Sequence, residues 1–290
     1  MAETIAILGG NGVYARHLIP RLVAEGHAVI ALVRRPEAAV FAHACGAAVR
    51  VADIFDPAAM TTALQGCSIG INLATSLPGP SGRGDFDAND RVRAEGVANW
   101  IAACRAAGVT RVIQQSIGMI CASGDDRWTD EHHLFPATPE TVSGRAFLAT
   151  QAMEAAITAS PLDWIILRGG LFYGPGTGFD DGWVGRAAAG KLKTPGTGED
   201  YVSLVHIADM ASASLAAVNH WPSRETLIVC DDAPATWRDV FSHVAAIANG
   251  PPPQPGGPPG FPSFRLRNAR AKDVLGWRPF HRNYRAGLAR

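Results

Sequence analysis

Charged side chains are scarce in this chain of 290 residues, where they make up 18% of the sequence. An average globular protein has roughly 25%. The 26 Lys and Arg balance 26 Asp and Glu, so the formal net charge is zero. A neutral chain gives no electrostatic reason to expect nucleic acid or an anionic membrane as a partner. The hydrophobic share of 47% predicts a sizeable buried core and excludes disorder as the general state.

Long apolar runs are also absent, since none approaches the roughly 18 residues that span a bilayer. The N-terminus lacks the positive region of a signal peptide, so we expect a cytoplasmic protein with no membrane partner. Cysteine is rare, and no C-x-x-C pattern occurs, which argues against a disulfide framework and a zinc site. We therefore expect no metal. The five cysteines are Cys45, Cys67, Cys104, Cys121 and Cys230.

The first half of the chain alternates short β-branched runs with alanine-rich amphipathic segments. This alternation predicts an α/β fold, a doubly wound parallel sheet with helices on both faces. The predicted strands cover residues 4–8, 28–33, 49–51, 69–73, 111–115, 163–167 and 226–229. The predicted helices include residues 13–25, 85–107, 206–219 and 236–249.

Two features of the chain predict its domain organisation. Near residue 170 the sequence changes from alternating strand and helix patterns to glycine-rich loops. This change predicts a sheet domain over residues 1–170. It also predicts a smaller C-terminal lobe over residues 171–290 that is interleaved with the sheet. In residues 250–262, eleven of thirteen residues are Gly or Pro. Such a segment forms neither a helix nor a central strand, and it is typical of a linker, with a lid over a pocket as the alternative.

A glycine-rich turn directly follows the first predicted strand. Gly9, Gly12 and Ala15 fit the pattern G-x-x-G-x-x-[G/A] between that strand and the first helix. The pattern needs glycine where a side chain is forbidden and where the backbone approaches a pyrophosphate at the helix N-terminus. The turn therefore predicts that residues 1–170 bind a dinucleotide, with contacts at Gly9, Gly12, Val13 and Tyr14.

Five further segments, in order, make the chain similar to the extended or atypical short-chain dehydrogenase/reductases, the NAD(P)-dependent epimerase/dehydratase-like proteins. They read VADI, INLAT, LRGGLFYGPG, VHIADMA and AKDVLGWRP, and begin at residues 51, 71, 167, 205 and 271. The resemblance runs nearly end to end. It implies a Rossmann fold with a small C-terminal substrate lobe, in which Asp53 and Ile54 meet the adenine and Leu73, Ala74 and Thr75 lie beside the cofactor.

The choice of cofactor can be argued from charge. An NAD-selective site usually places a carboxylate at the end of the second strand, to hold the ribose hydroxyls. Here the strand ends in Arg34 and Arg35, and no carboxylate occurs before Glu37. Guanidinium groups pair with a 2′-phosphate, so the sequence favours NADP(H), with Arg34 weighted above Arg35.

The catalytic residues of the family are largely missing. Its reductases use a Ser together with a Tyr and a Lys spaced Y-x-x-x-K on one helix face. Ser116 matches the serine, but residues 143–154, which should carry the other two, contain neither Tyr nor Lys. With Glu154 as the anchor of the comparison, Ala146 and Thr150 take their positions.

Aligning the helix on a different residue also leaves the Tyr and the Lys missing. With Pro139 as the reference, Ser143 and Phe147 stand in the two positions, so the standard proton donor is absent in either alignment. The family's frequent active-site Asn is replaced by Arg93 if Gly96 is the anchor. Because a positioned proton donor contributes about 10²–10⁴ in rate, we expect weak or no activity on generic ketones and alcohols.

Replacement acids can be named. His133 lies in a loop that precedes this helix, and histidine titrates near neutral pH, so it is our first choice. Tyr173, in the YGPG turn, is the second. For both residues a non-catalytic role is the alternative. Histidines in surface loops are often solvated, and the aromatic residue of this turn commonly has a structural role in the family. For His206 and Asp209 we favour a structural role at a helix start.

The sequence thus predicts an NADP(H)-dependent oxidoreductase that reduces a carbonyl or activated double bond through a non-standard proton donor. Its partner is a small-molecule substrate, expected to be apolar. Two alternatives stay open, a non-redox isomerase, cyclase or lyase, and a catalytically inactive nucleotide-sensing regulator. A homodimer is also left open. The aromatic residues that suggest an apolar ligand are Trp128, Phe135, Phe172, Phe179 and Trp183.

Overall fold

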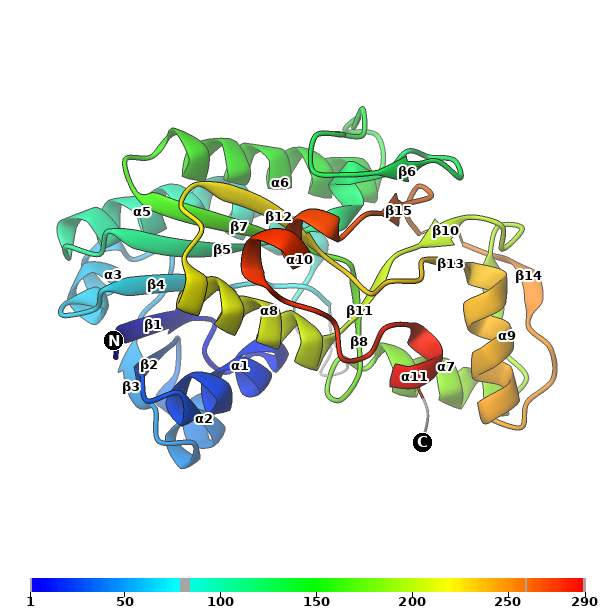
Figure 1. The fold of residues 1–290 in the computed structure, drawn as a ribbon, viewed down its shortest axis with the longest axis horizontal. Helices are drawn as coiled ribbons and strands as arrows, with labels where there is room; N and C mark the ends of the chain where they lie inside the picture. The colour runs from blue at the N-terminus through cyan, green and yellow to red at the C-terminus, as the bar shows by residue number, and fades with distance from the viewer. Residues whose placement is uncertain (1, 79–83, 259, 289–290) are drawn as a thin grey trace. The chain divides into compact units, whose positions relative to one another are not determined.

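A seven-stranded parallel sheet is the centre of the fold in the computed structural model, which describes residues 2–78, 84–258 and 260–288 (Figure 1). The strand order is β12-β7-β5-β4-β1-β2-β3. This confirms the predicted doubly wound sheet, and all seven predicted strands are present. They are β1 (Thr4–Leu8), β2 (Ala28–Val33), β3 (Ala48–Val51), β4 (Ile69–Asn72), β5 (Arg111–Ile117), β7 (Asp163–Gly169) and β12 (Glu225–Val229).

The strand order reverses between β1 and β4. From β1 the chain proceeds to β2 and β3 on one side, and β4 begins the series on the other side. Both neighbours of β1 pair with it in parallel. In doubly wound sheets ligands bind outside the carboxyl ends of the strands at such a reversal, so the order points to the loops after β1 and β4.

The residues divide into two compact units whose segments alternate along the chain. The first extends to Ser116 and includes Ala137–Leu167 and Ala211–Thr226. The second consists of Ile117–Pro136, Arg168–Met210 and the chain from Leu227 onward. The expected division into residues 1–170 and 171–290 stays a prediction.

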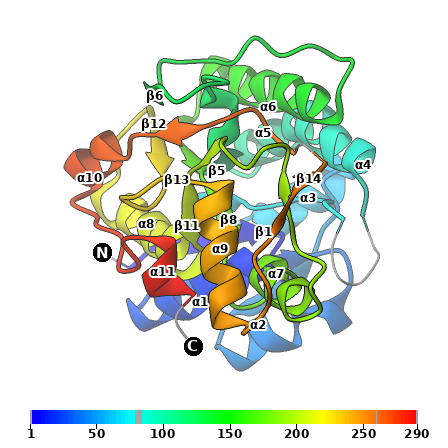
Figure 2. The ribbon, with the colours of Figure 1, turned by 90° about the vertical axis from the view of Figure 1, so that its right-hand side faces the viewer.

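Helices cover both faces of the sheet in the first unit. On one face lie α1 (Val13–Ala24), which continues through Pro20, and α2 (Val40–Ala44) (Figures 1 and 2). On the other lie α3 (Pro57–Leu64), α5 (Val97–Ala106) and α6 (Val142–Ala159). The second group buries apolar side chains against the sheet, which explains why these segments are amphipathic. Fully buried examples are Met60, Leu64, Trp100 and Ile157.

The long helix predicted over residues 85–107 is present without a gap from Phe86 to Ala106, but it contains a π-helical turn that the sequence did not predict. After α4 (Phe86–Arg91) comes a π-helical turn, Val92–Gly96, before α5 begins. A π turn inserts one residue and shifts the faces of the helix that follow it. Arg93 lies in this turn and is only 6% exposed, although the sequence gave no indication of a buried cation in this helix.

Short strands form four two-stranded pairs in the second unit. They are β6 (Trp128–Thr129) with β15 (Arg265–Leu266), β8 (Leu171–Tyr173) with β11 (Leu204–His206), β9 (Lys193–Pro195) with β14 (Gln254–Gly257), and β10 (Tyr201–Val202) with β13 (Ala235–Thr236). The two helices predicted near residues 206–219 and 236–249 are present. The helices of this unit are α7 (Phe179–Ala188), α9 (Trp237–Ile247), α10 (Ala269–Leu275) and α11 (Tyr284–Gly287). The first four residues of α8 (Ile207–His220) belong to this unit and the rest to the first unit.

The Gly/Pro-rich segment over residues 250–262 is more ordered than a free linker. Its residues 254–257 form β14 and pair with β9. The Gly256 N–H donates to the Gly196 carbonyl at 2.8 Å, and the Gly196 N–H donates to the Gly257 carbonyl at 3.0 Å. Proline is tolerated because this is a two-stranded edge pair and not a central strand. Residue 259 lies outside the described residues.

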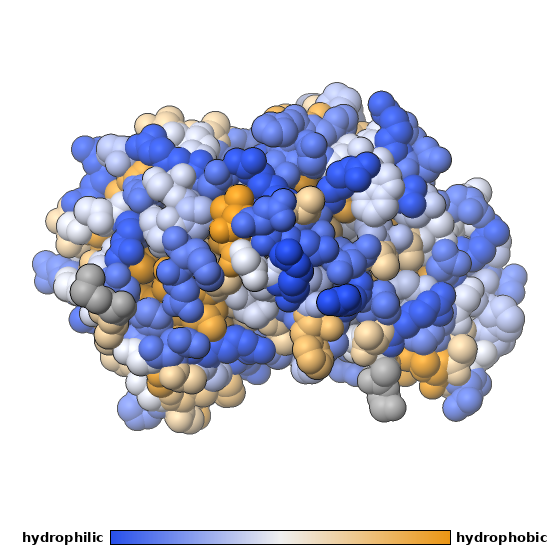
Figure 3. Space-filling model, viewed as in Figure 1, coloured by the Kyte–Doolittle hydropathy of each residue, from blue (hydrophilic) through white to orange (hydrophobic). Residues whose placement is uncertain are grey.

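The surface carries no large apolar face in the view of Figure 3, where hydrophilic residues predominate and apolar ones occur in small groups. In the described ranges, no helix has the length and apolar character needed to cross a membrane. Large apolar side chains that are fully buried include Trp100, Phe147, Phe264 and Leu18.

Candidate functional site

The turn after β1 has the geometry that its glycines predict. Gly9 has a φ of +79°, which is unfavourable for a residue with a side chain. The Gly12 N–H donates to the Gly9 carbonyl at 2.9 Å, and the Gly10 N–H donates to the Leu32 carbonyl at 3.1 Å. Gly12 begins α1 in an extended conformation, and within the described residues no side chain caps the helix. The first N–H groups of α1 are therefore available to an anion.

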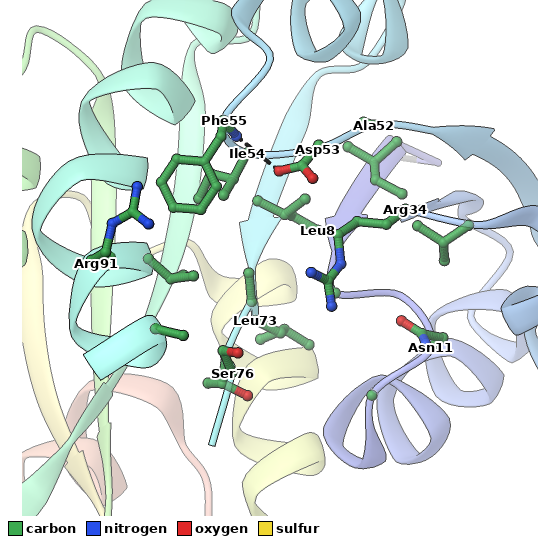
Figure 4. A pocket seen from close by; sticks show the side chains of 18 residues that line it. Leu8, Asn11, Arg34, Ala52, Asp53, Ile54, Phe55, Leu73, Ser76 and Arg91 are labelled. Carbon is green, nitrogen blue, oxygen red and sulfur yellow. Dashed lines mark hydrogen bonds between the residues drawn. The ribbon is translucent and has the colours of Figure 1, made fainter. Parts of the chain in front are cut away.

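A cavity of about 310 Å³ opens at this turn, beside the carboxyl ends of β1, β2 and β4 (Figure 4). Eight residues expected to contact the cofactor line it. They are Gly9, Gly12, Arg34, Asp53, Ile54, Leu73, Ala74 and Thr75. Among the lining residues that the sequence did not single out are Asn11, Phe55, Ser76, Ala88, Arg91 and Val92. Asn11 could have been found, because it stands inside the glycine pattern.

Three residues expected to contact the cofactor, Val13, Tyr14 and Arg35, do not line the cavity. The Tyr14 side chain is buried, and its hydroxyl lies 2.5 Å from the Ser214 hydroxyl of α8. Burial raises the pKa of Tyr14, and the hydrogen bond to Ser214 offsets only part of this. Tyr14 therefore joins α1 to α8 through its side chain.

The two arginines at the end of β2 are in different situations. Arg34 lines the cavity, and its guanidinium extends into it (Figure 4). Across the described ranges, no hydrogen bond or ion pair involves this side chain. Arg35 lies outside the lining and faces Glu37, with Nε 3.7 Å from Oε1. Arg34 is thus the cation that a 2′-phosphate would meet.

Another part of the cavity wall is formed around Asp53. Its Oδ1 accepts a hydrogen bond from the Phe55 N–H at 3.0 Å (Figure 4). The Arg91 guanidinium lies 5.3 Å from the centre of the Phe55 ring and is also paired with Glu95. The second Asp53 oxygen has no hydrogen bond or ion pair among the described residues, which agrees with the contact to the adenine that the resemblance implies.

Ser116 is buried at the end of β5, and its hydroxyl is already engaged. Its Oγ donates to Glu154 Oε1 on α6 at 2.5 Å. One turn earlier on α6, the Thr150 hydroxyl donates to the Ala146 carbonyl at 2.7 Å. In the alignment on Glu154, the missing Tyr and Lys are replaced by Ala146 and Thr150. Ala146 has no side-chain proton to donate, and the Thr150 proton is already donated to the helix backbone.

The alternative alignment on Pro139 supplies no proton donor comparable to the missing tyrosine. Phe147 is buried and carries no polar group. Ser143 lies in the first turn of α6, with its Oγ 3.3 Å from the Thr141 Oγ1. Neither residue can serve as a tyrosine or lysine does.

A buried cation lies beside Glu154. Burial lowers the pKa of Arg93 to about 10, and attraction to Asp90 and Glu154 offsets part of that effect. Burial also raises the pKa of Asp90, against the attraction of Arg93. Arg93, which stands where the family often has an active-site Asn, is thus stabilised in its charged form by the negative charges of Asp90 and Glu154.

The two proposed replacement acids lie in the second unit. His133 is half-buried in a loop, where its backbone N–H donates to the Asp130 carbonyl at 3.2 Å. The Tyr173 side chain is fully buried, with its hydroxyl 3.5 Å from the Asn283 carbonyl. Burial, followed by the nearby charge of Asp231, raises the pKa of Tyr173 well above its usual value. Such a tyrosine holds its proton firmly.

His206 and Asp209 contribute to a polar cluster with His281. Asp209 accepts hydrogen bonds from the His281 N–H and from the Phe280 N–H, at 2.9 and 3.0 Å. The His206 and His281 rings are stacked with centroids 3.8 Å apart. The three ligand atoms of the cluster lie within 4.8 Å of one another. Because Asp209 already holds the C-terminal segment, its contacts agree with the structural role that the sequence favours.

The aromatic residues expected to indicate an apolar ligand do not form one group. Trp183, on α7, is 3% exposed and packs against α9, with ring centroids 6.1 Å from Trp237 and 5.5 Å from Phe241. Trp128 instead lies under the guanidinium groups of Arg265 and Arg267. The composition of the chain alone therefore does not define the lining of a substrate pocket.

Comparison with known proteins gives the family. A family model described as NAD(P)H-binding matches residues 9–218. The chain belongs to this NAD(P)H-binding family. The predicted resemblance to atypical short-chain dehydrogenase/reductases and epimerase-like proteins is confirmed, and NAD(P) is the cofactor class. The uncapped start of α1, the close approach at Gly9 and the cavity beside them all fit the pyrophosphate and adenosine of this cofactor.

The relatives named as reductases include one from Streptomyces and one from Stigmatella aurantiaca. The chain is 32% identical to the 3-diazoavenalumate denitrifying reductase of a Streptomyces species, over 99% of each chain. It is 25% identical to a 4-hydroxy-2-methyl-3-oxo-4-farnesyl-3,4-dihydroquinoline-1-oxide ketoreductase of Stigmatella aurantiaca, over 81% of this chain and 70% of that protein. These names support a reductase-like, NAD(P)-binding protein.

Solved structures agree on the fold. The UDP-glucose 4-epimerase of Thermotoga maritima, with UDP-glucose, has a TM-score of 0.78 at 21% identity and covers 98% of this chain and 96% of its own. The UDP-glucose 4-epimerase of Thermus thermophilus, in complex with NAD, has a TM-score of 0.77 at 21% identity with the same coverage. At this identity the likeness shows the Rossmann-type fold alone.

Proposed function

We propose that this protein is an NADP(H)-dependent reductase whose substrate accepts a hydride without needing a proton from the enzyme. The observation that carries the proposal is the state of the hydroxyl groups at the catalytic positions. The Ser116 proton is donated to Glu154, and the Thr150 proton is donated to the Ala146 carbonyl. A carbonyl needs a proton donor as its oxygen gains negative charge, so these residues fit a substrate of another kind.

An aryldiazonium ion is a substrate of that kind. When bound, the reduced nicotinamide supplies a hydride. As the ring carbon of the diazonium gains the C–H bond, its C–N bond breaks and both bonding electrons leave with N₂. The product is a neutral arene, the positive charge passes to the oxidised cofactor, and no proton is taken up. The Streptomyces relative, named a denitrifying reductase of a diazo compound, supports this substrate class.

The preference for NADP(H) rests on Arg34. Its guanidinium extends into the cavity with no partner of its own among the described residues, while Glu37 is outside the cavity and pairs with Arg35. An unpaired guanidinium at the end of β2 favours a 2′-phosphate over ribose hydroxyls. We therefore assign NADP(H), and not NAD(H), as the cofactor used.

The Arg34→Ala variant should bind NADPH roughly 10- to 100-fold more weakly, the usual effect of losing a charge-assisted hydrogen bond of about 1.5–3 kcal/mol. NADH affinity should change little, because NADH carries no 2′-phosphate. Titration calorimetry at moderate ionic strength measures both. Arg35→Ala is the matched control, since it removes the neighbouring charge outside the cavity, and it should change NADPH affinity less than about threefold. Equal dissociation constants of NADPH and NADH for the wild type would contradict the assignment.

The source of the new hydrogen tests the reaction. With benzenediazonium as substrate and NADPH deuterated at the 4R or the 4S position, one of the two cofactors should place a single deuterium in the benzene formed. Unlabelled NADPH in D₂O should place none. N₂ should be released in amounts equal to the NADPH consumed. Non-enzymatic reduction is measured without protein and subtracted, and product labelled from the solvent would refute a proton-free hydride transfer.

Carbonyl reduction is the second candidate, supported by the ketoreductase name of the Stigmatella relative. In that case His133 is the first choice as the acid, because the Tyr173 hydroxyl is buried and holds its proton firmly. An aromatic ketone assayed with wild type and His133→Ala distinguishes the two candidates. Turnover that depends on His133 would favour carbonyl reduction, whereas no turnover in either protein agrees with the diazonium class.

A further inference from the structure

Arg93 is a buried cation without a direct partner. It lies in the π-helical turn Val92–Gly96 and is only 6% exposed. Across residues 2–78, 84–258 and 260–288, no hydrogen bond or ion pair engages its guanidinium. A guanidinium carries five N–H donors, and burying a charged group without hydrogen bonds is costly. These donors are thus left for a ligand.

Two nearby carboxylates attract Arg93 without forming an ion pair with it. The negative charges of Asp90 and Glu154 favour its charged form, but burial outweighs them and lowers the pKa of Arg93 to about 10. The guanidinium is therefore still charged at neutral pH. In the described part of the chain, Asp90 Oδ1 has no hydrogen-bond partner, so Arg93 does not donate to it. An anion at hydrogen-bond distance would add a direct contact that Asp90 and Glu154 do not supply.

The guanidinium of Arg93 faces an opening. The polar side-chain atoms that are fully enclosed and lack a hydrogen-bond partner among the described residues include Asn89 Nδ2 and Asp90 Oδ1 of α4, but no nitrogen of Arg93. Because Arg93 has no partner there either, its nitrogen atoms are not fully enclosed and must reach open space. The π-helical turn shifts the helix faces at this point, and such turns are frequent at functional sites.

The surroundings of Arg93 relate this opening to the catalytic positions. The π-helical turn and α4 pack against α6, which carries Glu154 (Figure 2). Glu154 in turn accepts the hydroxyl proton of Ser116, at the end of β5. The residues directly before Arg93, Arg91 and Val92, line the cofactor cavity. Arg93 is thus next to the cofactor cavity in the chain and near Glu154 in space.

We propose that Arg93 binds a carboxylate of the substrate, so that the protein acts on an aromatic acid. The inference rests on the proposed function, because it takes the substrate to lie at Ser116. The planar fork of a guanidinium can donate to both oxygens of a carboxylate, which fixes the orientation of the molecule that carries it. This contact is the same before and during hydride transfer, so its loss should raise KM more than it lowers kcat.

A pair of inert ligands tests the proposal without any turnover. Benzoate and benzamide have nearly the same shape and differ by one negative charge. Their dissociation constants for the protein–NADPH complex, in which the nicotinamide is uncharged, can be measured by ligand-observed NMR. For the wild type we expect benzoate to bind at least about tenfold more tightly than benzamide. In Arg93→Met the preference should fall below about threefold, with benzamide affinity unchanged.

Arg145→Met is the matched control. Arg145 is also attracted to Asp90, but it is exposed and its guanidinium donates to the Pro139 carbonyl. This variant loses the same charge at the surface and should keep the preference for benzoate.

Arg93→Lys covers the case in which Arg93→Met does not fold, as judged by NADPH binding. Lys keeps the charge but not the planar fork, so benzoate affinity should fall about 3- to 10-fold while benzamide affinity stays constant. Equal affinity of the wild type for the two ligands overturns the proposal. Wild-type affinity for benzoate in either Arg93 variant, once folded, overturns it as well.

The outcome is separate from that of the labelling experiment. A benzoate preference that depends on Arg93, found together with no release of N₂, would leave the inference standing and refute the diazonium reaction. Release of N₂ with no benzoate preference would do the opposite. If both proposals hold, 3-carboxybenzenediazonium should have a KM at least about tenfold below that of benzenediazonium, and Arg93→Met should remove this difference.

Discussion

Replacing Asp231 with Asn should stabilise the protein at pH 9 by about 2–4 kcal/mol of unfolding free energy, from the cost of ionising a buried carboxyl. Asp231 follows β12 directly and is 2% exposed. Its Oδ1 accepts a hydrogen bond from the Ala233 N–H at 3.1 Å, whereas its Oδ2 is buried with no hydrogen-bond partner in the described part of the chain. An ionised Asp231 would leave a charge there without compensation.

The direction of the pH dependence follows from the pKa. Burial raises the pKa of Asp231 from its ordinary value of 3.8 to about 8; the Ala233 N–H opposes the shift, and the charges of Asp232 and Asp209 add to it. The folded protein therefore keeps a proton that the unfolded chain releases. Stability falls as the pH rises from about 4 to about 8 and is constant above that range. Asn carries no charge at any of these pH values, so the variant should lack this fall.

Urea unfolding at pH 5, 7 and 9 measures the effect, and the gain from Asp231→Asn should grow with pH. Asp232→Asn is the control on the adjacent residue. Burial raises the pKa of Asp232, but its bonds to Lys272 and Asn268 outweigh this and hold it below its usual value. Its replacement should therefore destabilise the protein at pH 7. A loss of stability in Asp231→Asn at pH 9 would show that Oδ2 has a partner when ionised.

The sheet could be predicted from sequence because parallel strands covered on both faces are continuous apolar runs. TIAIL in β1 and AVIALV in β2 are of this kind, and they are almost wholly buried. The positions of the residues that follow such strands can then be predicted too, because the carboxyl ends of parallel strands all lie at one edge of the sheet. Gly9, Arg34 and Asp53 line the cavity for this reason.

The sequence could not predict which partners the side chains near the carboxyl ends of the strands would contact. Tyr14 is next to the glycine turn, yet its hydroxyl meets Ser214, 200 positions later in the chain. Arg34 lines the cavity, whereas its neighbour Arg35 lies outside the lining and contacts Glu37. The hydrogen bond from Ser116 to Glu154 spans 38 positions. Such contacts depend on which helix faces meet, and the π-helical turn before α5 changes those faces without a signal in the sequence.

The Gly9→Ala variant should lose NADPH affinity by about 100-fold or more, a larger loss than that expected for Arg34→Ala. A Cβ at Gly9 would lie 3.0 Å from the Leu73 carbonyl oxygen and 3.1 Å from the Ala74 nitrogen, both backbone atoms at the end of β4. The φ of +79° adds strain of about 1–2 kcal/mol for any L-residue with a side chain. The turn must then move away from β4, and the cavity wall and the start of α1 move with it.

Gly66→Ala separates the strain from the displacement of the turn. Gly66 has a φ of +77°, almost equal to that of Gly9, but a Cβ there would have no neighbour within 4 Å. Both variants should therefore lose about 1–2 kcal/mol of unfolding free energy through the backbone conformation. Only Gly9→Ala should also lose NADPH affinity, because only there does the methyl group displace the loop that approaches the pyrophosphate. If calorimetry finds wild-type NADPH affinity in a folded Gly9→Ala protein, the cofactor does not bind at the turn after β1.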